Sequence, residues 1–321
     1  MKGIHSVYIS DNRVKYRFEL TRNITVVQGN SGTGKTTLFE MISAFTRQKE
    51  KSSVQINCDK PCVALRPDSD WSIMLRNIKD SIVFIDEEAE YVSKPDFASA
   101  IKRTDNYYVI FTRENLYYLP YSVEEIYEVH TSGKIHTFRK MYRKQNGCRY
   151  SMTRKEKKKT EFSVFLVEDS KSGFQFYKHF FDGTMVKCLS AGANSSIYNR
   201  LVENIDKNIF VVADGAAFGA EMNKVMNLQE RFPNITICLP ESFEWMILKS
   251  GLIKAENLDV ILTQPSEYIE SSQYFSWERF FTDYLVQNTA DEHYSYNKKH
   301  LNSFYVVKSN MDRIVALIGL G

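Results

Sequence analysis

The chain has 321 residues, which is enough for about two domains at roughly 100–200 residues per domain. Apolar residues make up 43% of the chain and charged residues 25%, an ordinary globular composition that excludes an intrinsically disordered or fibrous protein. The net charge of +3, taken alone, argues against a protein dedicated to binding nucleic acid.

The first part of the chain is predicted to form short strands with few helices. The expected strands are Ser6–Ile9, Lys15–Leu20, Asn23–Gln28, Ser81–Ile85, Tyr107–Phe111 and antiparallel strands within Tyr117–Lys140. The first two are expected to form a hairpin that turns at Asp11-Asn12. A helix is indicated after residue 34 because Leu38, Met41, Ile42 and Phe45 recur at i, i+3, i+4 and i+7.

After residue 160, strands and helices alternate, and this rhythm predicts a parallel sheet with crossover helices. The expected strands are Phe162–Val167, Met185–Leu189, Asn208–Ala213 and Ile235–Leu239. The expected helices are Phe174–Phe181, Ser195–Ile205, Ala220–Glu230 and Ser242–Lys249. The last ~60 residues are expected to be helical, with a core stripe formed by Trp277, Phe280, Phe281, Tyr284 and Leu285. The expected fold class is therefore α/β.

A strongly basic stretch from Arg139 to Lys159 separates the two parts and marks the predicted domain boundary. It holds ten Lys and Arg residues against one acidic residue, so it contributes +9 and the remaining residues sum to −6. We therefore predict a first domain at 1–138, a basic linker at 139–160 and a second domain at 161–321. Clustered cations and the neighbouring Tyr142 and Tyr150 are typical of nucleic-acid contact; a solvated linker and a site for an acidic protein are the alternatives.

A glycine-rich loop in the first part fits the phosphate-binding pattern G-x-x-x-x-G-K-[ST] at every fixed position. The predicted nucleotide-binding residues are Gly29, Asn30, Ser31, Gly32, Thr33, Gly34, Lys35, Thr36 and Thr37. The glycines allow backbone N–H groups to face a phosphate, and the following helix presents its positive N-terminus. Lys35 is expected to reach the β and γ phosphates and the Thr36 hydroxyl to hold Mg²⁺. No N-K-x-D motif for guanine is found, which favours ATP.

A second apolar strand ends in the carboxylate pair Asp86 and Glu87. We expect Asp86 to join the Mg²⁺ shell and Glu87 to act catalytically, by orienting or deprotonating the attacking water. Thr112-Arg113, after the next strand, is interpreted either as a sensor of the γ-phosphate or as a surface pair. Two outcomes stay open for this site: the chain hydrolyses ATP, or it binds ATP without efficient turnover.

The loop and the carboxylate pair resemble the Walker A and Walker B elements of P-loop ATPases, and the early hairpin resembles the ABC-type and SMC-like branch. This resemblance covers about residues 1–135 and implies a compact P-loop NTPase domain. The chain departs from that branch between Lys35 and Asp86, where only 50 residues lie and no LSGGQ-like sequence is found. The composite dimer sites of that branch are therefore not expected.

Acidic residues also lie after the predicted strands of the second part. Glu168 and Asp214 follow its first and third strands, and Glu244 lies on the first turn of the helix after the fourth. Carboxylates gathered at one edge of a parallel sheet repel each other unless a cation intervenes. We therefore predict that these three residues bind Mg²⁺ and are catalytic.

This order of carboxylates resembles the TOPRIM domain of topoisomerases, primases and OLD-family nucleases, which implies a Mg²⁺ site for phosphodiester chemistry. Glu168 matches the glutamate of that family and Asp214 the first residue of its Asp-x-Asp, but Ala216 replaces the second aspartate. Glu244 resembles a later acidic position of OLD-type domains. The alternative reading is that Glu168 and Asp214 cap helices of a flavodoxin-like sheet.

A P-loop domain followed by a TOPRIM-like domain with a helical C-terminal part resembles the OLD family. The resemblance implies an ATP-binding and ATP-hydrolysing protein coupled to a Mg²⁺-dependent nuclease, in defence against mobile elements such as phage. It implies ATP and Mg²⁺ as cofactors, and nucleic acid, a second copy of the chain or a partner protein as partners. The alternatives are a nucleotide-gated regulator with an inactive TOPRIM-like domain and a plain ATPase or nucleotide kinase.

The chain opens without a charged-then-apolar leader, and no apolar run approaches the ~20 residues that span a bilayer, so a cytoplasmic protein without membrane contact is expected. Its cysteines are too few and too scattered for a disulfide framework. We expect reduced thiols at Cys58, Cys62, Cys148, Cys188 and Cys238.

Overall fold

The structure is a computed structural model that describes every residue except 31, 49–51, 68–69, 146, 152–160 and 321. The chain divides into two compact units, Met1–Met141 with Thr263–Ser276 and Tyr142–Leu262 with Trp277–Gly321. The first unit contains a mixed sheet and the second a mostly parallel sheet, each together with helices. The predicted α/β class is therefore confirmed. Within the described ranges, no helix has the length and apolar character needed to cross a membrane.

The first unit contains a mixed sheet whose nine described strands run in the order β4-β1-β2-β9-β8-β3-β7-β6-β5. The strands are β1 His5–Ser10, β2 Lys15–Leu20, β3 Ile24–Gln28, β4 Gln55–Asn57, β5 Cys62–Leu65, β6 Ile82–Ile85, β7 Tyr107–Phe111, β8 Ile126–Ser132 and β9 Ile135–Lys140. The predicted hairpin is confirmed as β1 and β2, which pair antiparallel with His5 opposite Leu20. The expected antiparallel strands within Tyr117–Lys140 begin only at Ile126, because residues 117–119 form turns in which Leu119 N donates to Leu116 O at 3.0 Å.

The order of the parallel strands determines which loops meet at one edge of the first sheet. β7 lies between β3 and β6 and pairs parallel with both, with Val27 opposite Phe111 and Ile85 opposite Ile110. All three strands are fully buried, as their continuous apolar sequences predict. Their carboxyl ends therefore bring together the glycine-rich loop after β3, Asp86 after β6 and Thr112 after β7.

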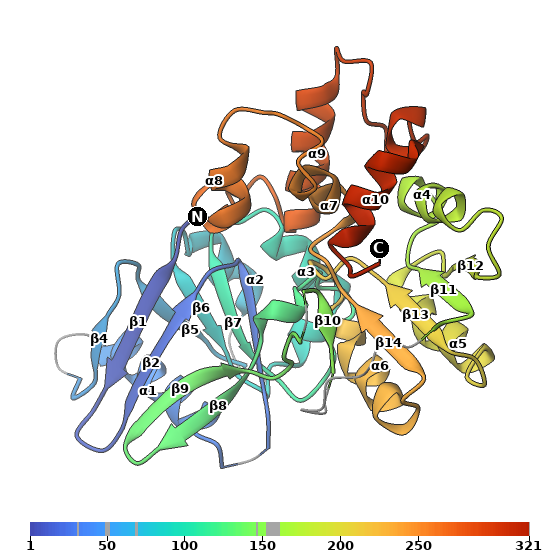
Figure 1. Cartoon of the computed structure of the whole chain (residues 1–321). Helices are drawn as coiled ribbons and strands as arrows, with labels where there is room; N and C mark the ends of the chain where they lie inside the picture. The colour runs from blue at the N-terminus through green and yellow to red at the C-terminus, as the bar shows by residue number, and fades with distance from the viewer. Residues whose placement is uncertain (31, 49–51, 68–69, 146, 152–160, 321) are drawn as a thin grey trace. The chain divides into compact units, whose positions relative to one another are not determined.

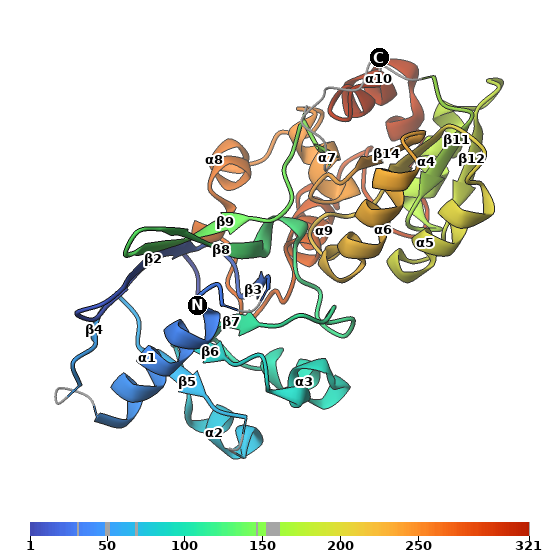
Figure 2. The same ribbon diagram turned by 90° about the horizontal axis from the view of Figure 1, so that it is seen from below.

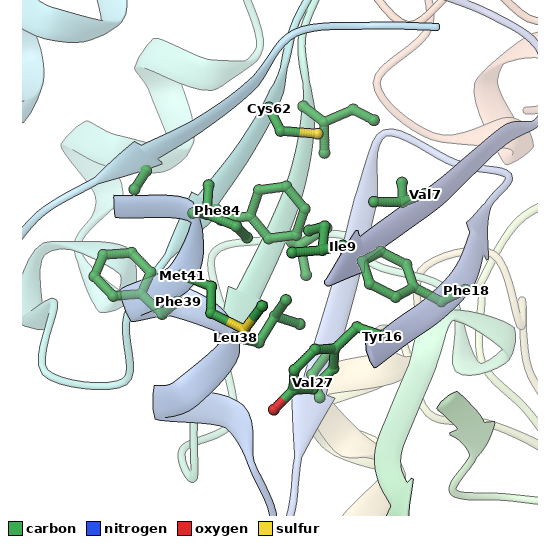
Figure 3. Close-up of a cluster of buried hydrophobic side chains, with 14 of the residues drawn as sticks. Val7, Ile9, Tyr16, Phe18, Val27, Leu38, Phe39, Met41, Cys62 and Phe84 are labelled. Atoms are coloured by element: carbon green, nitrogen blue, oxygen red, sulfur yellow. The ribbon is translucent and has the colours of Figure 1, made fainter. Parts of the chain in front are cut away.

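The core of the first unit lies between its sheet and helix α1, Lys35–Gln48 (Figure 3). Leu38 and Met41 of α1 are buried against Ile9 and Phe18 of the hairpin and Phe84 of β6. Two shorter helices, α2 Trp71–Asn77 and α3 Pro95–Ile101, pack against each other. Figure 2 shows α1 alongside β5 and β6, and its first residue, Lys35, follows the loop after β3 directly.

A late segment, Thr263–Ser276, belongs to the first unit although it lies far along the chain. Gly3 N donates a hydrogen bond to Ser266 O at 2.7 Å, and Ser271 N donates to Met1 O at 3.0 Å. Asn23 Nδ2 donates to Phe275 O at 3.0 Å. The N-terminus of the chain and the strand β3 are thus anchored by residues that the sequence pattern does not connect with them.

The second unit contains a five-stranded sheet in the order β10-β14-β13-β11-β12, in which β10 alone among the described strands is antiparallel. The strands are β10 Arg149–Tyr150, β11 Val164–Val167, β12 Lys187–Ser190, β13 Ile209–Val212 and β14 Ile235–Cys238. The helices are α4 Ser172–Phe180, α5 Asn194–Glu203, α6 Gly219–Arg231, α7 Phe243–Lys249, α8 Leu258–Thr263, α9 Trp277–Thr289 and α10 Lys308–Ala316. Figure 1 shows α5 and α6 on one side of this sheet and α4, α7 and α10 on the other. The predicted alternation is confirmed, with β11 and β13 adjacent and in register.

The expectation that all cysteines are reduced is wrong for one pair, because Cys148 and Cys238 form a disulfide with Cα atoms 5.1 Å apart. The short strand β10 explains the pairing: Arg149 lies opposite Cys238, and Leu239 N donates a hydrogen bond to Cys148 O at 2.8 Å. The two cysteines are 90 residues apart in the sequence, so their spacing gave no indication of contact. Cys58, Cys62 and Cys188 are free thiols, as expected.

Candidate functional site

The glycine-rich loop follows β3 and has a backbone that only glycine adopts easily. Gly29, Gly32 and Gly34 have φ angles of +130°, +78° and +101°. Gly34 O accepts the first α1 hydrogen bond from Leu38 N at 3.0 Å, so the earlier amides of the helix lie at the loop. Thr36 and Thr37 are exposed on the first turn of α1.

Other loop residues stabilise this conformation. Thr33 Oγ1 donates to Asn30 O at 3.1 Å, which closes the turn from within. The predicted ligand Ser31 lies outside the described residues. Tyr16 of β2 supports the loop from behind: its hydroxyl donates to Gly34 O at 2.8 Å, and its ring stacks on His136 with centroids 4.6 Å apart. Burial raises the pKa of Tyr16 to about 12, so its hydroxyl remains a donor at neutral pH.

Lys35 lies under the loop, with only 4% of its side chain exposed. Its ammonium donates to Gly29 O at 2.6 Å and to Asn30 O at 3.0 Å. It also lies 3.5 Å from Glu87 Oε2. A buried ammonium needs such partners because desolvation of an unpaired charge is costly. The positive charge is therefore held where the loop would surround a phosphate.

Glu87 links the loop to the end of β7. Arg113 Nη2 lies 2.5 Å from Glu87 Oε1, while the opposite carboxylate oxygen faces Lys35. Asp86 lies beside them and accepts a hydrogen bond from Glu87 N at 2.6 Å. Burial raises the pKa of Asp86, and the nearby carboxylates of Glu88, Glu40 and Glu87 raise it further. This edge of the sheet, at the carboxyl ends of β3, β6 and β7, thus combines the cations Lys35 and Arg113 with a larger number of carboxylates.

Two glycines of the loop provide a matched test of its geometry. A Cβ at Gly34 would lie 2.9 Å from the Tyr16 hydroxyl, whereas a Cβ at Gly32 would meet nothing within 4 Å. We expect Gly32→Ala to lower the free energy of unfolding by about 1–2 kcal/mol, through backbone strain alone. Gly34→Ala should cost about 1–3 kcal/mol more, because buried Tyr16 must shift. Urea unfolding measures both, and equal costs would show that Tyr16 does not constrain the loop.

The three predicted carboxylates of the second unit line one small cavity of about 20 Å³. Glu168 and Asp214 follow the adjacent strands β11 and β13, and Glu244 lies on the first turn of α7. Asp214 N donates to Glu168 Oε2 at 2.7 Å, and Phe243 N donates to Asp214 Oδ1 at 3.2 Å. The three acidic side chains therefore share the lining of one cavity, together with Asp169, and their metal-binding role stays a prediction.

Sequence reasoning missed the cation of this cavity. Lys298 also lines it, with its Nζ 2.6 Å from Glu278 Oε1 and 3.4 Å from Glu244 Oε1. Tyr296 was missed as well, and its hydroxyl donates to Glu244 Oε1 at 2.8 Å. No sequence pattern near Lys298 points to β11 or β13, because the segment reaches the cavity through tertiary packing alone.

The charges of the cavity are poorly balanced. Burial raises the pKa of Glu168 to about 7. Burial also raises the pKa of Asp214 well above its usual range, and Glu278, Glu168 and Glu244 add to this effect. Burial lowers the pKa of Lys298, but Glu244, Glu278 and Asp214 outweigh it and raise that pKa above its ordinary value. One ammonium therefore faces several carboxylates in a poorly solvated space.

The remaining features predicted from the sequence are the residues next to the carboxylates of the cavity and the basic stretch. Asp169, next to Glu168, accepts a hydrogen bond from Phe174 N in the first turn of α4 at 2.8 Å, and both carboxylates line the cavity. Ala216 is buried. Tyr142 and Tyr150 of the basic stretch are buried, so the expectation that they contact nucleic acid is wrong for these two rings. Residues 152–160 lie outside the described part of the chain, so nucleic-acid contact by the basic side chains stays a prediction. In the described ranges no group of three or more His, Cys, Asp or Glu side chains is arranged to hold a metal ion.

A scan against protein-family models finds no matching family, and a search of curated proteins finds no match either.

Proposed function

We propose that the first unit binds ATP and hydrolyses it. The observation that carries this proposal is the position of Lys35, whose buried ammonium bridges the glycine-rich loop and Glu87. A fixed cation below a loop of positive-φ glycines, at a helix N-terminus, is the arrangement that binds a polyphosphate. ATP is preferred to GTP because no guanine-binding motif accompanies the loop.

Each residue of this edge has a proposed task. The loop amides and Lys35 bind the phosphates, and Glu87 orients or deprotonates the attacking water. Arg113, which is 59% exposed, faces the same space and stabilises charge on the γ-phosphate. When ATP enters, Lys35 exchanges the carbonyl oxygens of Gly29 and Asn30 for phosphate oxygens.

Mg²⁺ fits the donor set of this edge. The Thr36 hydroxyl and the Asp86 carboxylate are hard oxygen ligands, and the nearby carboxylates of Glu88, Glu40 and Glu87, which raise the pKa of Asp86, would favour a cation there. Bound there with the nucleotide, Mg²⁺ would neutralise phosphate charge.

A second function is proposed for the cavity of the second unit, which is Mg²⁺-dependent processing of nucleic acid by a TOPRIM-like site. The observation that favours it is Glu244 Oε2, which is buried and has no hydrogen-bond partner. Glu168, Asp214 and Glu244 offer the carboxylate oxygens that Mg²⁺ prefers, although their present arrangement includes Lys298. Mg²⁺ held by them would supply a Lewis acid for phosphodiester chemistry.

The nuclease proposal predicts that replacing Glu168 or Asp214 by alanine abolishes metal-dependent cleavage. The assay incubates plasmid, single-stranded DNA and tRNA with Mg²⁺ or Mn²⁺, with and without ATP. Asp206→Ala, a change at an exposed aspartate of the same unit, is the control. If no substrate is cleaved under ATP, or if cleavage survives both cavity variants, the nuclease is wrong and the nucleotide-gated regulator with an inactive TOPRIM-like domain is the better account.

A further inference from the structure

Lys298 lies inside the carboxylate cavity of the second unit, and we propose that it is an internal cation which a divalent metal ion must displace. This inference rests on the proposed metal site formed by Glu168, Asp214 and Glu244, and it adds a residue that controls occupancy of that site. Lys298 would thereby keep the cavity free of metal until its side chain moves.

The first support is the position of the ammonium. Lys298 Nζ lies 2.6 Å from Glu278 Oε1 and 3.4 Å from Glu244 Oε1, and its side chain is 30% exposed. Glu244 is 1% exposed, so it has little access to water and depends on Lys298 and Tyr296 for its partners. Lys298 therefore provides the positive charge that this buried carboxylate needs.

The second support is that the backbone holds Lys298 in place. Lys298 O accepts a hydrogen bond from Ser172 N at 3.1 Å, at the start of α4. Gln175 of α4 donates to Lys299 O at 2.8 Å and accepts from Leu301 N at 2.9 Å. The Ser172 and Tyr296 hydroxyls lie 2.6 Å apart. The main chain is thus anchored at Lys298 and just after it, so rotation of the side chain about its own bonds is the smallest movement that takes the ammonium out of the cavity.

The third support is the small volume of the cavity. The cavity has a volume of about 20 Å³, which is enough for about one water molecule. A metal ion with its ligands and the ammonium therefore cannot occupy it together without rearrangement. Glu244 Oε2, which has no hydrogen-bond partner, is the oxygen left unsatisfied by the single ammonium. A divalent cation would offset more of the negative charge, but it competes with Lys298 for Glu244.

The experiment is a calorimetric titration of the full chain with MnCl₂ in the absence of nucleotide. We expect Lys298→Met to bind Mn²⁺ at least about tenfold more tightly than the unmodified chain, because a positive charge 3.4 Å from the proposed ligand Glu244 is removed. Lys298→Arg keeps the charge and should bind like the unmodified chain. Lys299→Met, at the exposed neighbouring lysine, is the matched control and should change nothing.

Two further variants locate the effect. Lys298→Gln is made in parallel, so that the comparison stands if the methionine variant does not fold. Adding Glu244→Gln to Lys298→Met should abolish the gain in Mn²⁺ affinity, which assigns it to this cavity and not to the P-loop. Equal affinity of the unmodified chain and the two neutral variants, Lys298→Met and Lys298→Gln, would overturn the inference while leaving the metal site intact. Absence of binding in every variant would overturn the metal site and the inference together.

Discussion

Replacing Lys35 by alanine is expected to lower the affinity of the chain for ATP by about 100-fold and to reduce hydrolysis to background. The ammonium lies 2.6 Å and 3.0 Å from two loop carbonyls and is therefore already positioned for phosphate oxygens. A hydrogen bond to a charged group contributes about 1.5–3 kcal/mol, and 1.4 kcal/mol corresponds to a factor of ten. Titration with a fluorescent ATP analogue measures the affinity, and phosphate release measures the hydrolysis.

The control for this change is Lys79→Ala, which removes an exposed lysine of the same unit. It should leave both ATP affinity and hydrolysis unchanged. Urea unfolding of Lys35→Ala without nucleotide distinguishes lost binding from lost folding, because the variant also removes partners of Gly29 O and Asn30 O. A folded Lys35→Ala chain that binds ATP as tightly as the unmodified chain would contradict the proposed phosphate site.

Replacing Glu87 by glutamine is expected to slow ATP hydrolysis by about 10²–10⁴-fold while ATP affinity is largely kept. Glutamine preserves the size of the side chain but cannot accept the proton of an attacking water. The structure places the carboxylate between Lys35 and Arg113, facing the space above the loop. Single-turnover hydrolysis and equilibrium binding, measured on the same preparation, separate the two effects.

Glu88→Gln is the matched control for Glu87, the proposed catalytic carboxylate. Glu88 is adjacent in the sequence and exposed, whereas the ion pairs with Lys35 and Arg113 are made by Glu87. We expect its hydrolysis rate to stay within about twofold of the unmodified rate, since exposed substitutions rarely perturb a site. If both variants lose hydrolysis equally, the local negative charge matters and Glu87 is not a specific base.

In the first unit, local patterns were sufficient to predict the elements that carry the site. The strand β3, the glycine-rich loop and α1 follow directly from β-branched residues, glycines and an apolar stripe, and each is observed. The pattern could not place β7 between β3 and β6, because strand order depends on packing between distant segments. That strand order brings Arg113 to Glu87. The sequence alone could therefore not decide whether Arg113 is a γ-phosphate sensor or a surface residue.

In the second unit, the alternation of strands and helices predicted the sheet, and the rule that carboxyl ends gather at one edge predicted that Glu168 and Asp214 would meet. The pattern could not reveal Lys298 or Tyr296, which come from an irregular segment after α9. Nor could it reveal β10, which has only two residues and so shows no alternation. The disulfide between Cys148 and Cys238 was missed for the same reason.

The central claim is that the first unit is an ATP site, and calorimetric titration of the unmodified chain with ATP and Mg²⁺ tests it most directly. We predict saturable binding of one ATP per chain, weakened when Mg²⁺ is chelated, with a Kd well below the roughly millimolar level that corresponds to about 4 kcal/mol. Absence of binding at millimolar ATP, in a chain that is folded by its unfolding transition, would contradict the claim.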